Sequence, residues 1–275
     1  MARFTNNPLF INTILLGGTP QDKVIAAARA GFDQVELWRQ DVEAHTGDAK
    51  NLARLLDNEQ TGLTDYQVLL DFDGAPDARR DAKRKEALQM LETAVLLGAT
   101  TLLTPASTDP DCVAGREEED LRWLSREAGK RGLKIAFEAM AWSTHINNLP
   151  AAWKLVQKIN EPNLGLVVDA FHIFVRNRTV ADLAGIPVEK IFLVQLSDLA
   201  TLPSQDHIVD IARHQRLLPG QGNFPLYTLL NALHKQGYQG PIGLEVFNDR
   251  YHQQPPVEVA REAMHALKRE CAATG

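Results

Sequence analysis

Four oxygen-bearing side chains stand at or near the C-terminal ends of strand-like apolar runs. They are Glu138 in LKIAFEAMAW, Asp169 in LGLVVDAFHIF, Gln195 in IFLVQLSDL and Glu245 in GLEVFND. An unpaired charge inside a strand covered on both faces costs several kcal/mol, so each carboxylate needs a partner. A divalent cation is the simplest partner common to all four. An all-oxygen ligand set predicts one Mg²⁺ or Mn²⁺, with Co²⁺ as a substitute, and disfavours zinc.

Taken singly, each carboxylate is better explained by pairing with a Lys or Arg, but three carboxylates and one amide on successive strands favour a shared ion. His172 follows Asp169 by three residues, so it lies just beyond a strand end. Although a lone histidine is usually structural, this placement makes His172 a candidate catalytic base, alongside Glu138 and Glu245. His145, seven residues past Glu138, is a weaker candidate for contact with the substrate.

A polar loop with the sequence ARHQRLLPGQGNFP follows the seventh strand-like run. Its Arg213, His214 and Arg216 would suit a substrate carboxylate or phosphate, because guanidinium offers paired donors. Pairing of these arginines with the acidic stretch QDHIVD is an alternative that the sequence leaves open. The G-x-G in this loop lacks the third glycine and the strand–helix placement of a dinucleotide fingerprint. Tyr66 and Phe247 complete the candidate substrate-binding set.

Apolar, β-rich runs alternate with helical patterns along the whole chain, and glycines recur where a helix would stop before the next strand. The expected strands cover residues 11–15, 34–37, 62–69, 101–104, 134–137, 164–168, 191–196 and 241–245. The expected helices cover residues 21–30, 48–57, 79–97, 117–130, 150–159, 226–235 and 257–268. Eight such units in 275 residues predict a single (β/α)₈ TIM-barrel domain over residues 1–275, whose site lies at the C-terminal mouth of the strands. A doubly wound open sheet is the main rival.

The composition indicates which partners the protein is expected to bind and in which compartment it is expected to lie. The formal net charge is −6 and the basic residues form no long run, which disfavours nucleic-acid binding. The apolar run from Ile11 to Leu16 is too short for a signal peptide or a membrane span, so we expect a cytoplasmic protein without membrane contact. Cys112 and Cys271 are far apart and show no CxxC spacing, so both are expected to be bystanders. The sequence leaves open whether the chain forms a homo-oligomer.

These motifs give the chain a resemblance to the xylose-isomerase-like TIM-barrel superfamily of sugar phosphate isomerases and epimerases. The resemblance extends from INT and GFDQVELW near the N-terminus to EVFND near the C-terminus. It implies that Glu138, Asp169, Gln195 and Glu245 are the metal ligands. Gln195 stands in place of the histidine common in ketose epimerases. Together with RHQRLLPGQGNFP and LEVFND, it makes the chain most similar to bacterial 3-dehydroshikimate dehydratases.

The resemblance implies a metal-dependent lyase that acts by enolate formation on a small polyhydroxylated keto substrate. One position departs from the dehydratase pattern: Leu70 stands just before DFDG, where an arginine is expected. Loss of that cation favours the alternative of an isomerase or epimerase acting on a keto-sugar or keto-inositol. Two rivals come from other classes, a DNA-repair endonuclease with several zinc ions and a non-catalytic sugar-binding barrel. Metal content would distinguish one hard ion per chain from several zinc ions or none.

Overall fold

The computed structural model describes residue 4 and residues 6–272, and its strands form one closed parallel barrel. The strands pair in sequence order and β1 closes the barrel by pairing with β8, so the TIM-barrel prediction is confirmed and the open sheet is excluded. The strands are β1 (Leu9–Asn12), β2 (Gln34–Trp38), β3 (Gly62–Gln67), β4 (Thr101–Pro105), β5 (Lys134–Glu138), β6 (Leu164–Asp169), β7 (Ile191–Leu196) and β8 (Ile242–Leu244).

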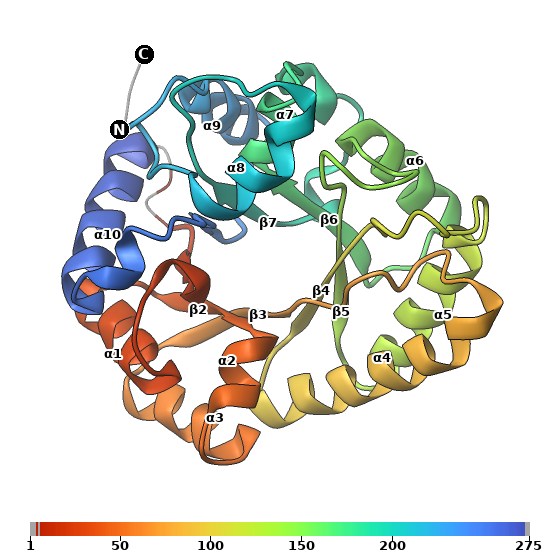
Figure 1. The fold of residues 1–275 in the computed structure, drawn as a ribbon, viewed down its shortest axis with the longest axis horizontal. Helices are drawn as coiled ribbons and strands as arrows, with labels where there is room; N and C mark the ends of the chain where they lie inside the picture. Colours follow the sequence, from red (N-terminus) through yellow and green to blue (C-terminus); the bar gives the residue numbers. More distant parts are fainter. Residues whose placement is uncertain (1–3, 5, 273–275) are drawn as a thin grey trace.

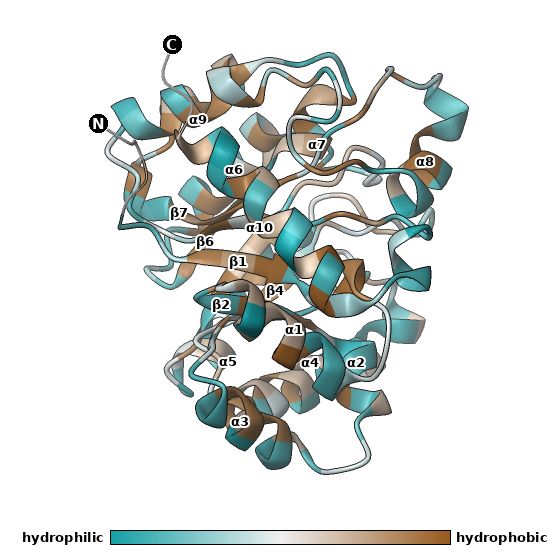
Figure 2. Ribbon diagram, turned by 90° about the vertical axis from the view of Figure 1, so that its left-hand side faces the viewer, coloured by the Kyte–Doolittle hydropathy of each residue, from teal (hydrophilic) through white to brown (hydrophobic). Residues whose placement is uncertain are grey.

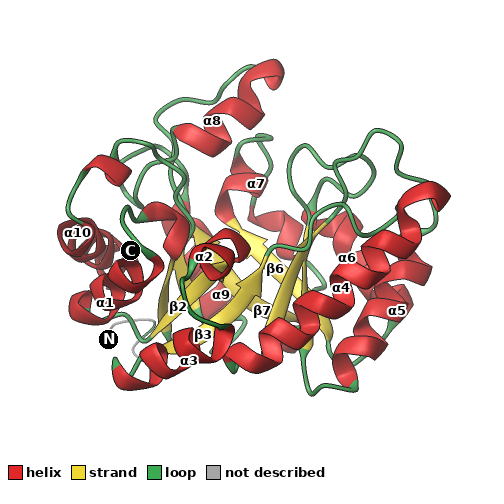
Figure 3. Ribbon diagram, turned by 60° about the horizontal axis from the view of Figure 1, so that its bottom comes forward, coloured by secondary structure: helices red, strands yellow, loops and turns green. Residues whose placement is uncertain are grey.

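Helices surround the strands on the outside of the barrel (Figure 1). The α-helices are α1 (Pro20–Ala30), α2 (Arg39–Ala44), α3 (Ala49–Asn58), α4 (Asp77–Leu97), α5 (Glu117–Gly129), α6 (Leu149–Ile159), α7 (Ala170–Phe174), α8 (Ile208–His214), α9 (Leu226–Lys235) and α10 (Pro256–Ala272). Short 3₁₀ helices cover Thr13–Leu15, Val180–Leu183, Val188–Lys190, Gln205–His207 and Tyr251–Gln253. Figure 3 shows α8 among the loops above one end of the barrel. No helix of the described residues is long and apolar enough to cross a membrane.

Helix α1 shows how local sequence sets the boundaries of the outer layer. Thr19 accepts a hydrogen bond from the backbone N–H of Asp22, and the Asp22 side chain accepts one from the N–H of Thr19. Pro20 occupies the first turn, where its missing N–H has no intrahelical partner to lose. The helix ends at Gly31, whose φ of 86° is favoured by glycine.

An apolar layer fills the inside of the barrel, separate from the larger core between strands and helices. It consists of Phe10, Val68, Leu103, Ala136, Val167 and Leu193. Gly243 makes room for it, because a Cβ at this position would lie 2.3 Å from the Phe10 ring. The hydropathy colouring shows apolar strands enclosed by helices of mixed character (Figure 2). The barrel is therefore a packed core rather than a pore.

The first strand and three short helices differ from the sequence predictions. Residues 11–15 were expected to be a strand, but β1 ends at Asn12 because the Asn12 side chain accepts a hydrogen bond from Ile14 N–H and starts a 3₁₀ turn. Helices α2, α7 and α8 were not predicted, since they have only 6, 5 and 7 residues and too few turns to show a periodic pattern. The segment after α7 holds only the short 3₁₀ helix Val180–Leu183 before the 3₁₀ turn that leads into β7.

Candidate metal centre and substrate cavity

Strand periodicity places the four predicted ligands directly above the apolar interior layer. Because side chains two positions apart on a strand face the same side, each interior residue of four strands is followed by a polar one. The pairs are Ala136 and Glu138, Val167 and Asp169, Leu193 and Gln195, and Gly243 and Glu245. Asp169 and Gln195 are also direct partners in the β6–β7 register. The polar layer therefore lies at the C-terminal end of the strands.

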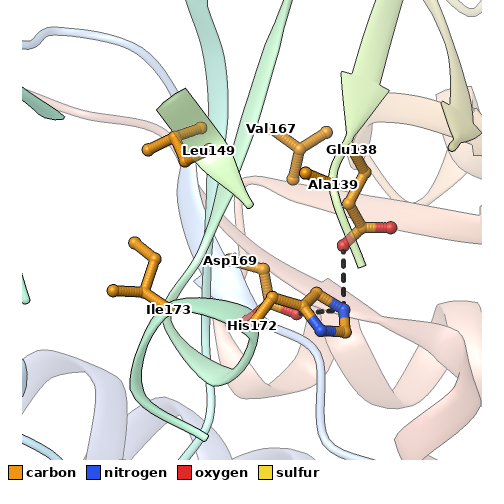
Figure 4. A pocket seen from close by; sticks show the side chains of 7 residues that line it. All are labelled: Glu138, Ala139, Leu149, Val167, Asp169, His172 and Ile173. Atoms are coloured by element: carbon orange, nitrogen blue, oxygen red, sulfur yellow. Dashed lines mark ion pairs between the residues drawn. The ribbon is translucent and has the colours of Figure 1, made fainter. Parts of the chain in front are cut away.

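Glu138, Asp169 and His172 form a buried cluster in which the potential metal-ligand atoms lie within 4.8 Å of one another. Figure 4 shows both carboxylates directed towards the imidazole of His172, whose Nε2 lies 3.5 Å from Glu138 Oε1 and 3.5 Å from Asp169 Oδ2. His172 Nδ1 accepts a hydrogen bond from the backbone N–H of Ala141 at 3.1 Å, which leaves the proton of a neutral ring on Nε2. Burial, and then the charge of Arg216, lower the pKa of His172 well below its usual value. A neutral His172 therefore presents an N–H to the carboxylates rather than a lone pair to a metal.

Arg216 is the buried cation of the polar layer. Its Nη1 lies 3.1 Å from Asp169 Oδ2 and 3.1 Å from Glu245 Oε2, so one guanidinium bridges two of the predicted ligands. Its Nε donates to the carbonyl of Ala212, the residue four positions earlier. The guanidinium also lies over the Phe171 ring, at 4.3 Å from its centroid. These contacts hold Arg216 in one orientation beside the candidate metal centre.

Gln195 has its amide nitrogen occupied and its oxygen free. Nε2 lies 2.9 Å from Glu36 Oε1 and 3.3 Å from Glu245 Oε1, and donates to both. As a result, Gln195 Oε1 is buried without a hydrogen-bond partner, and Glu138 Oε1 is likewise buried and unpartnered. Such orphaned oxygens are rare in native proteins and need an explanation. A hard cation that takes oxygen ligands fits both of them.

The charge balance of the layer also fits a cation. Five carboxylates of the polar layer are buried, and two of them pair with Arg216; the five belong to Glu36, Asp65, Glu138, Asp169 and Glu245. Burial is the main cause that raises their pKa values, to about 8 for Asp65 and about 7 for Glu245, and well above the usual value for Glu36 and Glu138. Neighbouring carboxylates raise the pKa of Glu138 and Glu36 further. One guanidinium does not balance this set, and a bound divalent cation would offset two more of the negative charges.

A cavity of about 400 Å³ opens onto the polar layer. Glu138, His172, Arg216 and Glu245 line its floor, and Trp38, Trp142 and Phe247 supply aromatic walls. Arg213 and Leu70 line its outer part, where both are exposed. Arg213 forms no ion pair or hydrogen bond with any described residue, so a cation is available at the rim for an anionic ligand.

The structure separates the six predicted substrate-binding residues into two groups. Arg213, Arg216 and Phe247 line the cavity, whereas Tyr66, His145 and His214 lie outside it. Tyr66 faces the helices because its neighbours Asp65 and Gln67 face the interior, and it borders a different depression with Arg39 and Glu86. His214 Nδ1 lies 3.0 Å from Asp249 Oδ2 on the surface. His145 Nε2 lies 3.0 Å from the carbonyl oxygen of Cys112.

Several residues of the polar layer were missed by the sequence analysis. Glu36 and Asp65 lie in β2 and β3, and Asn12 Nδ2 donates to Glu245 Oε1 at 3.1 Å. Gln67 also lines the cavity floor. Glu36 carried a usable signal, because it is a carboxylate within the apolar run QVELW, the same feature that singled out Glu245.

Comparison with known proteins identifies a family and several relatives that this chain resembles. A family model described as "Xylose isomerase-like TIM barrel" matches residues 24–270. A 3-dehydroshikimate dehydratase of Pseudomonas aeruginosa is 35% identical over 94% of this chain, and the match covers 40% of the relative. The chain thus spans about two-fifths of the length of that relative. An inosose isomerase of Halalkalibacterium halodurans is 25% identical over 85% of this chain and 84% of its own length.

One solved structure of the same fold contains a bound zinc atom. The crystal structure titled "IOLI protein with a binding zinc atom" superposes with a TM-score of 0.85 at 23% sequence identity. It covers 96% of this chain and 98% of that chain. This likeness shows the shared fold, and the bound zinc is a property of that protein.

Proposed function

Because the chain belongs to the xylose isomerase-like TIM barrel family, we propose that it is a divalent-metal-dependent lyase of the 3-dehydroshikimate dehydratase type. The observation that carries this proposal is the ring of strand-end oxygens, two of them buried without partners, at the floor of a cavity with a free arginine at its rim. The relative with this activity that is 35% identical over 94% of the chain supports it. The substrate would be a small polyhydroxylated keto acid.

Glu138, Asp169, Gln195 and Glu245 would hold the cation, which is Mg²⁺ or Mn²⁺, with Co²⁺ as a substitute. When bound, the ion would supply positive charge to stabilise an oxyanion that develops from the substrate carbonyl. His172 contributes no lone pair in the tautomer fixed by Ala141 N–H. Its Nε2 instead lies 3.5 Å from each of the Glu138 and Asp169 carboxylates without a hydrogen bond to Glu138 Oε1, which leaves that oxygen available to the cation.

The carboxylate of Glu138 is the proposed base. It is buried at the cavity floor, its Oε1 has no hydrogen-bond partner, and burial followed by the charge of Glu245 raises its pKa well above the usual value. A cation bound by one oxygen of Glu138 would offset this rise in pKa, and the other carboxylate oxygen would take the proton. Glu138 would take a proton from the carbon next to the carbonyl and return it to the hydroxyl that leaves as water, so the net reaction is dehydration.

Arg213 is the proposed partner of the substrate carboxylate. It is on α8, lines the cavity, and has no competing partner among the described residues. A charge-assisted contact of this kind typically contributes about 1.5–3 kcal/mol when well formed. Arg216 is less available because Asp169 and Glu245 already occupy its Nη1.

The second candidate is an isomerase or epimerase that acts on a neutral keto-inositol or keto-sugar. Leu70 favours it, because this apolar side chain stands on the cavity wall where the dehydratase pattern led us to expect an arginine. The inosose isomerase relative at 25% identity is consistent with such a substrate. Both candidates require the same metal centre and proton transfer next to a carbonyl.

One assay distinguishes the two. The purified chain would be freed of metal with a chelator, loaded separately with Mg²⁺, Mn²⁺ and Co²⁺, and incubated with 3-dehydroshikimate, keto-inositols and ketoses. We expect metal-dependent dehydration of 3-dehydroshikimate that is lost in Glu138→Gln. Isomerisation of a neutral keto substrate without dehydration would establish the alternative. Full activity in chelator would refute both.

A further inference from the structure

A second group of metal-ligating side chains lies away from the cavity that holds the proposed active site. Cys112 is on the β4–α5 connection, Glu117 is the first residue of α5, and His145 is on the β5–α6 connection. One ligand atom from each lies within 4.8 Å of the others. None of the three lines the substrate cavity. The cluster brings together segments that are apart in sequence.

Glu117 is a buried carboxylate with no compensating partner. It is 5% exposed and forms no hydrogen bond or ion pair with any described residue. The nearby arginines are committed elsewhere, since Arg116 binds Asp77 and the Ala75 carbonyl, and Arg80 binds Glu119 and Asp120. The carboxylate of Glu117 is therefore available to a cation, which would add a favourable charge interaction at this position.

The other two members of the cluster are the exposed imidazole of His145 and the buried thiol of Cys112. His145 Nε2 lies 3.0 Å from the Cys112 carbonyl oxygen, and a ring that donates through Nε2–H leaves Nδ1 with its lone pair. Metal-binding histidines commonly donate their second nitrogen to a backbone carbonyl in this way. Cys112 Sγ is buried and lies 3.4 Å from the Asp73 carbonyl, to which the thiol donates. Burial raises the pKa of this thiol to about 11, so metal binding would release its proton.

We propose that Cys112, Glu117 and His145 bind one Zn²⁺ that clamps the loops beside the active site. A set of one thiolate, one imidazole and one carboxylate suits zinc, in contrast to the oxygen ligands of the cavity. The clamp would reach the cavity wall through the β3–α4 loop. Asp73 and Asp71 of this loop accept hydrogen bonds from Ser107 N and Thr108 N, and Asp71 and Thr108 line the cavity.

The absorption spectrum of bound Co²⁺ provides a test that is selective for this site. A thiolate bound to Co²⁺ gives a sulfur-to-metal charge-transfer band in the near ultraviolet, and the proposed catalytic ligands include no sulfur. We expect the band in the metal-freed wild-type chain after addition of Co²⁺, and in Cys271→Ser, whose buried thiol lies on α10. The band should be absent in Cys112→Ser, and Zn²⁺ should abolish it in the wild type. Zinc content at saturation should be one equivalent lower in Cys112→Ser than in Cys271→Ser.

Two further variants keep the result interpretable. Glu117→Gln keeps the volume of the side chain and should lower the Co²⁺ affinity, measured by titration of the charge-transfer band, at least about tenfold. This variant tests the site even if Cys112→Ser does not fold. Glu138→Gln should retain the band, so that failure of the proposed activity and failure of this site are observed separately. Absence of the band in the folded wild type, or an unchanged band in Cys112→Ser, would overturn the proposal.

Discussion

Replacing Leu70 by arginine should raise activity towards an anionic keto substrate. Leu70 follows β3 and lines the outer part of the cavity to which Arg213 also contributes. Its carbonyl oxygen accepts a hydrogen bond from Lys83 Nζ at 2.8 Å, so the backbone at this position is held in place while the side chain is free to change. An arginine here would place a second guanidinium at the cavity rim.

The expected gain in kcat/KM depends on how exposed the side chain of residue 70 is. A charge-assisted hydrogen bond contributes about 1.5–3 kcal/mol when well formed. Because Leu70 is 42% exposed, solvent screening limits the contact to the lower part of that range. With about 1.4 kcal/mol per factor of ten, Leu70→Arg should increase kcat/KM for 3-dehydroshikimate roughly 10- to 30-fold. The gain should shrink as salt is added.

The assay follows formation of the aromatic product under kcat/KM conditions. Leu70→Gln is the matched control, because it provides reach and polarity without charge, and it should stay within about threefold of the wild type. Arg213→Gln should lower kcat/KM at least about tenfold, whereas Arg261→Gln, an exposed arginine on α10, should not. Equal gains in Leu70→Arg and Leu70→Gln would refute the electrostatic reasoning. A strong wild-type activity that Leu70→Arg leaves unchanged would show that Arg213 already suffices.

Three further changes test the polar layer and its surroundings. Glu245→Gln should weaken metal binding and remove turnover, and in chelator it should destabilise the fold less than loss of Arg216 does, because Asp169 still pairs with Arg216; wild-type turnover would reduce Glu245 to a structural partner of Arg216. Arg216→Met should lower the free energy of unfolding in chelator by about 3–5 kcal/mol, because it leaves buried charges unpaired, and a loss below about 1 kcal/mol in urea titrations would contradict the ion pairs. Burial raises the pKa of Asp73 from 3.8 to about 7, so the native state binds this proton more tightly than the unfolded state and wild-type stability should fall as pH rises from 3.8 to about 7. When the free energy of unfolding is measured in chelator, Asp73→Asn should remove up to about 4 kcal/mol of this decline. Parallel pH profiles of the two proteins would contradict the prediction.

The barrel was predictable because its signals repeat. Eight apolar runs alternate with seven helical patterns, so an error in one element, such as the first strand, did not change the fold. The short helix α8 was not predictable in this way, although it carries Arg213 and stands above the barrel end. With 7 residues it offers too little periodicity, and its position depends on packing of Ile208 and Ala212 against Phe171.

The site was predictable to the extent that its residues follow strand periodicity. Glu138, Asp169, Gln195 and Glu245 end or follow apolar runs; in the structure Glu138 and Asp169 cluster with His172, and Gln195 Nε2 lies 3.3 Å from Glu245 Oε1. Loop residues carry no comparable rule, and His145 and His214 lie outside the cavity for that reason. The tautomer of His172 depends on a contact with Ala141, 31 residues earlier in the chain, which no local pattern reveals.

The barrel interior has an apolar layer that stabilises the fold and, towards the C-terminal ends of the strands, a polar layer that would hold the active site. The apolar layer of Phe10 and its neighbours is fully packed, and Gly243 is the close-contact position on which that packing depends. One step further along the strands, the packing is replaced by carboxylates that Arg216, Gln195 and Asn12 satisfy only in part. The oxygens that remain unpartnered are a cost to the metal-free protein and a ready ligand set for a cation. Metal binding should therefore stabilise the fold as well as enable the reaction, because the same atoms account for both.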